Sequence, residues 1–168
     1  MLTVTRWVVK ALLLLNLVVG TILLLLLLFS FASEARFLAT LDRINPGRDA
    51  AALLGWARII LATVAPVMVA AHLLFVRLLA LLRTVEEGDP FVAANARRLQ
   101  MVAWCLLAIQ VCDLLFGWAA TGFDVAAGER TTGRSPGITG WVAVLLVFVL
   151  ARVFEAGTRL RDDAELTI

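Results

Sequence analysis

The sequence contains four long apolar stretches separated by short polar segments. The first has 23 residues without a charge, between Lys10 and Glu34, and a helix of that length spans about 35 Å. The hydrocarbon layer of a bilayer is roughly 30 Å thick, so such stretches are typical of transmembrane helices. The predicted spans are residues 11–33, 59–76, 99–123 and 135–151. The pattern predicts an all-α membrane protein whose residues 1–168 form a single transmembrane domain.

The first stretch has one competing interpretation, a cleaved signal peptide. Arg6 and Lys10 would be its basic end, and residues 30–32 (Ser-Phe-Ala) offer a cleavage site. The apolar core of a signal peptide runs only about 7–15 residues, however, so an uncleaved membrane helix is favoured.

Four spans place both termini on the same side of the membrane, in an up-down-up-down bundle. The side with the termini and the second connection carries nine Lys and Arg residues, and the other side carries six. Lys and Arg are enriched in the cytoplasmic loops of membrane proteins, so both termini are predicted to be cytoplasmic.

The connections between the spans differ in pattern. The first and third are predicted to be loops, because residues 45–47 (Asn-Pro-Gly) interrupt one and several glycines interrupt the other. In the second, residues 78–87 continue the helical pattern and Gly88 suits a left-handed helix end. Asp89 and Pro90 then suit the start of the next helix. The second and third spans are therefore predicted to form a cytoplasmic helical hairpin that extends about 15 Å beyond the membrane.

Asp113 is the only charged residue within the third span. A carboxylate near the middle of a bilayer costs around 2.5–3.5 kcal/mol, so its side chain is expected to face the bundle interior. It is either a protonated hydrogen-bond donor that ties helices together or a proton or cation site. Helical spacing places it on a small or polar face, opposite a bulkier face suited to lipid. The first face contains Ala103, Leu106, Gln110, Asp113, Gly117 and Ala120, and the second contains Trp104, Leu107, Ala108, Val111, Leu115 and Trp118.

Two residues of the second span, His72 and Pro66, are candidates for a functional role. His72 is the only histidine, and it is predicted to be neutral and hydrogen-bonded near Asn16, at a similar depth on the first helix. A haem with two axial ligands is disfavoured, because no second histidine exists. Pro66 predicts a helix kink, and it could also mark a substrate path.

Other chemistry finds little support in the composition. Apolar residues make up 62% of the chain and the net charge is only +2, which argues against direct nucleic-acid binding. No catalytic, phosphate-binding or metal-binding motif is present. Cys105 and Cys112 are expected to be small buried apolar groups. The chain is therefore predicted to be non-enzymatic, without a metal or a cofactor.

Two motifs carry a resemblance to a known family. One is Gly88-Asp89-Pro90-Phe91 followed by Asn95 and Arg98, and the other is the C-terminal Leu166-Thr167-Ile168. With the four spans, they make nearly the whole chain resemble the bacterial membrane family catalogued as domain of unknown function 2975. The family ending usually reads closer to Glu-Asn-Asp-Leu-Thr-Ile, whereas residues 163–165 here are Asp-Ala-Glu.

The resemblance implies a location in the bacterial plasma (inner) membrane. Members of the family are commonly encoded beside a small helix-turn-helix regulator, which implies that the regulator is a partner of the membrane protein. We therefore expect a cytoplasm-facing adaptor for a small DNA-binding regulator. Its contact residues would be Asp89, Pro90, Phe91, Asn95 and Arg98 on the hairpin and Leu166, Thr167 and Ile168 on the tail.

Several alternatives stay open at this point. The hairpin and the tail could simply pack on each other. The chain could be a transporter or ion-pathway subunit built around Asp113, Gln110, Pro66 and His72. It could also be a structural partner of another membrane complex, or a homo-oligomer.

Overall fold

The structure, a computed structural model, describes residues 2–87, 92–129 and 137–165. These residues form helices and turns, without a strand. The helices are α1 (Leu2–Ala32), α2 (Glu34–Ile44), α3 (Ala50–Ala62), α4 (Val64–Glu86), α5 (Ala93–Ala127) and α6 (Ile138–Glu165). By length and composition, four segments could cross a membrane: Thr3–Ala32, Ala50–Glu86, Ala93–Ala127 and Ile138–Arg161. The chain thus has the helices of a multi-pass membrane protein.

The first connection is mostly helical, so the prediction of a loop there is wrong. Two helices, α2 and α3, fill it and leave only residues 45–49 between them. Gly47 takes a positive φ of 78° in this turn, a conformation that costs glycine little. The side chain of Asp49 then accepts hydrogen bonds from the backbone N–H groups of Ala51 and Ala52, at 2.9 and 3.1 Å. This N-cap starts α3 immediately after the turn.

A short break at Thr63 divides the second apolar segment into α3 and α4. Pro66 lies three residues after the break. A proline has no N–H to donate to the carbonyl four residues earlier, and its ring clashes with that carbonyl. The carbonyl concerned belongs to Ala62, the last residue of α3. The missing hydrogen bond at Pro66 thus coincides with the break between the two helices, and the bend angle predicted there stays a prediction.

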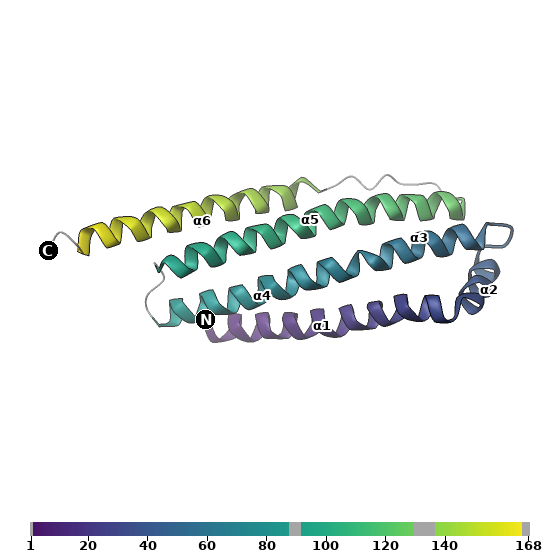
Figure 1. Cartoon of the computed structure of the whole chain (residues 1–168), viewed down its shortest axis with the longest axis horizontal. Coiled ribbons are helices and arrows are strands. Elements are labelled where there is room, and N and C mark those ends of the chain that lie inside the picture. Colours follow the sequence, from purple (N-terminus) through teal and green to yellow (C-terminus); the bar gives the residue numbers. More distant parts are fainter. Residues whose placement is uncertain (1, 88–91, 130–136, 166–168) are drawn as a thin grey trace.

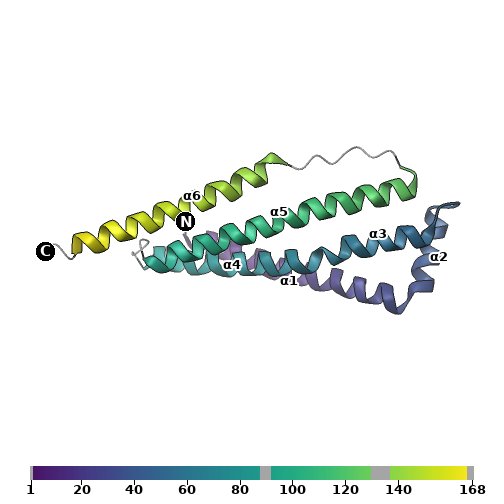
Figure 2. The ribbon, with the colours of Figure 1, turned by 45° about the horizontal axis from the view of Figure 1, so that its top comes forward.

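The long helices lie side by side in an open row (Figures 1 and 2). α1 packs on α3 and α4, these two pack on α5, and α5 packs on α6. Within the described residues, the backbone of α1 does not pack directly on α5 or α6, and that of α4 does not pack directly on α6. The expected bundle is therefore not closed around one interior. A row can persist in a membrane because lipid tails cover the open apolar faces as well as leucines would.

Small residues let neighbouring helices of the row approach closely. Gly20 of α1 lies against the side chain of Met68 in α4, and Gly140 of α6 lies against the side chain of Gln110 in α5. A Cβ atom at Gly122 of α5 would lie 2.7 Å from the ring of Trp56 in α3. Such contacts through glycine are typical of helix pairs in membranes.

The central helix, α5, largely follows its predicted faces. Ala103 and Ala120 are buried, as predicted, and Trp104 and Trp118 on the opposite face are more than half exposed. Cys105 and Cys112 are also buried, as expected. Around Cys105, a small core joins α4 to α5 through Ala70, Leu74 and Val102.

Candidate functional site

One end of the molecule gathers the residues of the predicted docking surface. There α1 begins, α4 ends, α5 begins and α6 ends (Figure 1); we call it the hairpin end. Six of the predicted contact residues, Asp89, Pro90, Phe91, Leu166, Thr167 and Ile168, lie outside the described residues. The structure therefore places only Asn95 and Arg98 of that set.

Asn95 and Arg98 join the start of α5 to the end of α4. The Asn95 side chain is 1% exposed, and its Nδ2 donates a hydrogen bond of 2.8 Å to Oγ1 of Thr84. Its Oδ1 accepts a 2.7 Å hydrogen bond from Arg98, which also donates to the Ala80 carbonyl at 3.4 Å. A buried amide needs such partners. These two side chains thus hold the two arms of the hairpin together, and Asn95 offers no surface of its own.

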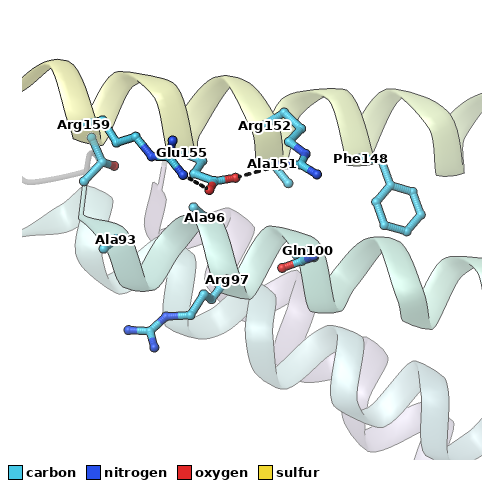
Figure 3. A pocket seen from close by; sticks show the side chains of 10 residues that line it. Ala93, Ala96, Arg97, Gln100, Phe148, Ala151, Arg152, Glu155 and Arg159 are labelled. Atoms are coloured by element: carbon cyan, nitrogen blue, oxygen red, sulfur yellow. Dashed lines mark hydrogen bonds and ion pairs between the residues drawn. The ribbon is translucent and has the colours of Figure 1, made fainter.

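A polar cleft of about 440 Å³ lies between α5 and α6 at the hairpin end (Figure 3). Its floor is formed by small side chains, among them Ala96 of α5 and Ala151 of α6. The polar side chains that line it are Arg97 and Gln100 of α5 and Arg152, Glu155, Thr158 and Arg159 of α6. We call this site the α5–α6 cleft.

The charges of the α5–α6 cleft are arranged around one carboxylate. Glu155 accepts hydrogen bonds from Arg152 at 3.3 Å and from Arg159 at 2.7 Å, drawn as dashed lines in Figure 3. The two arginine side chains are 82% and 75% exposed. Exposed ion pairs contribute little to stability, so these arginines remain available to an external anion. The two arginines of α6 outnumber the one carboxylate between them, so this side of the cleft suits an acidic ligand group.

The sequence carried a signal for this cleft in the spacing of three charged residues of α6. Arg152, Glu155 and Arg159 are spaced three and four residues apart, so they share one face of a helix. Their place in a cleft shared with Gln100 of α5 depended on knowing which helix packs on α6. The structure shows that α5 packs on α6, and the sequence pattern alone does not.

The intramembrane residue Asp113 is exposed, so the prediction that it faces a bundle interior is wrong. In the row, α5 has neighbours on two sides and is open on the other two, and Asp113 lies towards an open side. It borders a groove of about 570 Å³ between α1, α4 and α5, which Asn16 and Thr63 also line. Gln110, three residues earlier, lies instead against Gly140 of α6.

His72 and Asn16 do not form the expected pair. Nδ2 of Asn16 donates to the backbone carbonyl of Met68 at 3.1 Å, one helical turn before His72. Nδ1 of His72 is buried and has no hydrogen-bond partner among the described residues. At this level Gly20 lies against the Met68 side chain, so α1 approaches α4 closely at Met68.

Metal chemistry finds no site in the part of the chain that the structure describes. No group of three or more His, Cys, Asp or Glu residues there is arranged to hold an ion. Asp113 and His72, the intramembrane titratable groups considered above, do not line one groove together: Asp113 lines the groove between α1, α4 and α5, and His72 does not.

The fold and these sites define a multi-pass α-helical membrane protein with a polar end. A family model described as "Protein of unknown function (DUF2975)" matches residues 7–168, nearly the whole chain. The chain therefore belongs to this family, as the motifs at residues 88–98 and 166–168 predicted. No curated protein and no solved structure matches it.

Proposed function

We propose that this protein is a non-enzymatic adaptor of the bacterial plasma membrane. Its hairpin end faces the cytoplasm, with both termini inside, and docks an acidic amphipathic helix of a small helix-turn-helix regulator. The excess of Lys and Arg on the side of the termini supports this orientation.

The observation that carries the proposal is the far end of α6. This helix continues to Glu165, well past the apolar span predicted to end at residue 151, and it projects beyond the neighbouring helices (Figures 1 and 2). Val153 and Leu160 are 57% and 71% exposed there. Seven residues separate them, so they share one face of α6. With the span ending at residue 151, as predicted from the sequence, this exposed apolar pair lies outside the lipid, where a partner helix would cover it.

The α5–α6 cleft supplies the charged border of that stripe. Arg152 and Arg159 each lie one residue before Val153 and Leu160, so cationic and apolar positions alternate around the exposed side of α6. A helix with an apolar face and flanking carboxylates would match both kinds of position. Complementary charge would then select this partner and speed its association.

The test is capture of one defined regulator by the full-length protein in mild detergent. A helix-turn-helix regulator encoded beside a gene of this family is co-expressed, and its recovery is measured for the wild type and for Arg152→Glu with Arg159→Glu. We expect the double variant to recover at least ~10-fold less regulator, because like charges would meet at the interface.

A matched control places the same charge change at the opposite end. Arg36→Glu with Arg43→Glu alters two arginines of α2, far from the hairpin end (Figure 1), and should leave recovery within twofold. Equal loss in both double variants would mean that net charge alone matters, and it would contradict docking on α6. A reporter of the regulator's target genes should follow the same pattern: its output should change in the variant with Arg152→Glu and Arg159→Glu, and not in the variant with Arg36→Glu and Arg43→Glu.

A second candidate function rests on the groove that contains Asp113. A carboxylate that borders a groove at mid-depth in the membrane, beside Asn16 and Thr63, could bind a proton or a cation on a transport path. Asp113→Asn removes the charge and keeps the shape. Loss of proton or cation flux in proteoliposomes, with unchanged regulator capture, would favour transport; unchanged flux would discard it.

A further inference from the structure

A second polar pocket at the hairpin end lies between α1, α4 and α5, apart from the α5–α6 cleft. Its volume is about 450 Å³, and it is formed by the start of α1, the last turns of α4 and the start of α5. We call it the α1–α4 pocket. Its lining includes four cationic side chains, Arg6, Lys10, Arg83 and Arg98.

Two of these cations are neutralised by neighbouring carboxylates. The Arg6 guanidinium lies 3.6 Å from a carboxylate oxygen of Glu86. Arg83 donates to Glu87 at 2.8 Å, one turn further along the same helix. These two ion pairs border the pocket, so its net positive charge comes from Lys10 and Arg98.

The other two cations have neutral partners. Arg98 donates to the Oδ1 of Asn95 and to the Ala80 carbonyl, at 2.7 and 3.4 Å. Nζ of Lys10 lies 5.3 Å from the ring centre of Trp7 and has no carboxylate within 4.0 Å in the described part of the chain. Glu87, which also lines the pocket, pairs with Arg83, so within the described residues Lys10 and Arg98 have no carboxylate partner. Positive charges of this kind in a recess between helices favour an anionic ligand.

The depth of the pocket indicates where that anion comes from. Lys10 immediately precedes the uncharged stretch 11–33, and Arg98 immediately precedes the span 99–123. Both therefore lie at the boundary between the hydrocarbon layer and the headgroups. Trp7, which is 68% exposed, is the kind of side chain that is enriched at this boundary.

We propose that the α1–α4 pocket binds the phosphodiester headgroup of an anionic phospholipid. Lys10 and Arg98 contact the phosphate oxygens, and the acyl chains follow the exposed leucines of α1 into the hydrocarbon layer. Basic pockets between transmembrane helices commonly recognise such headgroups. The site is independent of the proposed adaptor function, since it uses a different pocket.

Native mass spectrometry of the full-length protein tests the proposal. The protein is extracted into mild detergent, exposed to mixed phosphatidylglycerol and phosphatidylcholine, and the retained lipids are counted. We expect the wild type to retain phosphatidylglycerol in preference to phosphatidylcholine. Lys10→Gln should weaken that retention about fivefold, the effect of about one cationic charge at a membrane surface, and Lys10→Arg should restore it.

Arg77→Gln is the matched control. Arg77 is an exposed cation that directly follows the span 59–76, and it does not line the pocket. It should change phosphatidylglycerol retention less than twofold. Equal weakening by Arg77→Gln and Lys10→Gln would show attraction by surface charge alone and overturn the site. Displacement of the lipid by millimolar inorganic phosphate would overturn the lipid assignment, because the pocket would then take a soluble anion. No preference for phosphatidylglycerol in the wild type would overturn both.

Discussion

The first and the central transmembrane helices, α1 and α5, show opposite relations between apolar character and burial. α1 is the most apolar of the four spans, yet only 6% of its most apolar window is buried inside the protein. α5 is the least apolar, and 28% of its window is buried. In water the order would be reversed, since apolar surface is driven inward. In lipid, an apolar helix is already solvated by the lipid tails. The helix with small and polar side chains is therefore the one that packs more extensively against its neighbours.

The residues at the two interfaces explain this difference. The buried positions of α5 are mainly small, and they include Ala103, Ala119 and Ala120. In α1, the leucine run Leu23–Leu28 contains no small residue, and the helix comes close to α4 mainly through Gly20 and the Asn16 amide. Burial in this protein therefore follows side-chain size and hydrogen bonding, and the predictions below test that rule in order of expected effect.

The largest effect is expected from overfilling the central helix. Ala103 is 0% exposed, so a phenyl ring there has no free space. Ala103→Phe should lower the free energy of unfolding by about 3 kcal/mol, because neighbouring helices must move apart. The measurement is a titration of the detergent-purified protein with sodium dodecyl sulfate, followed by circular dichroism.

A matched change at the edge of the row sharpens this prediction. Leu25 of α1 is 58% exposed, and a ring at that position would extend into lipid. Leu25→Phe should change the free energy of unfolding by less than about 0.5 kcal/mol. If the two variants lose the same stability, the contrast between the central and edge helices does not hold.

The second-largest loss of stability is expected from the hydrogen bonds of Asn95, which join α4 to α5 and which we call the hairpin clamp. Asn95→Ala removes the hydrogen bonds to Thr84 and from Arg98 and leaves a cavity at a position that is 1% exposed. We expect a loss of about 2 kcal/mol in the same titration. Thr84→Val should show a smaller loss, and the double variant should lose less than the sum of the two, because both changes break one shared bond. Fully additive losses would contradict the clamp.

The four long helices were largely predictable from the sequence, because the length and apolar composition of a stretch are enough to identify a transmembrane helix. The lipid-facing side of α5, with Trp104 and Trp118, was also predictable, because helical periodicity separates bulky from small positions. Pro66 signalled its break through the chemistry of its missing N–H. The start of α3 had a signal as well, the capping residue Asp49, but the Asn-Pro-Gly turn beside it suggested a longer loop.

The environment of Asp113 could not be predicted in the same way. Its expected inward position assumed a closed bundle with one interior, whereas a helix in the middle of a row has two packed sides and two open sides. One sequence gives the faces of each helix and not the neighbour of each face. The α5–α6 cleft depended on the same missing information, because residues of α5 and α6 line it together only when the two helices pack on each other.

An intermediate loss of stability is expected from the contacts of Arg58, at the corner where α1, α2 and α3 meet. Arg58 donates to the Ser30 carbonyl at 2.6 Å and to Glu34 at 3.0 Å, and its guanidinium lies 4.1 Å from the ring centre of Phe31. Arg58→Met keeps the stem of the side chain and removes these bonds, and it should cost about 1 kcal/mol in the same titration. Arg58→Lys should recover only part of the loss, because an ammonium cannot reproduce the planar guanidinium fork. Full recovery by lysine would mean that charge alone holds the corner.

The smallest effect is expected at the contact between α1 and α4. Asn16→Leu removes one hydrogen bond, from Nδ2 to the Met68 carbonyl at 3.1 Å, and extends the apolar surface of α1. Side-chain hydrogen bonds between membrane helices are worth about 0.6 kcal/mol on average, so we expect a loss of that size. It should be roughly a third of the loss caused by Asn95→Ala, although both changes remove an asparagine that joins two helices. The physical reason is that Asn95 is buried and makes hydrogen bonds to two side chains, whereas Asn16 donates one hydrogen bond and borders an open groove. Equal losses would mean that an edge helix is held as firmly as the central one, and the comparison between α1 and α5 would then describe composition without energetic consequence.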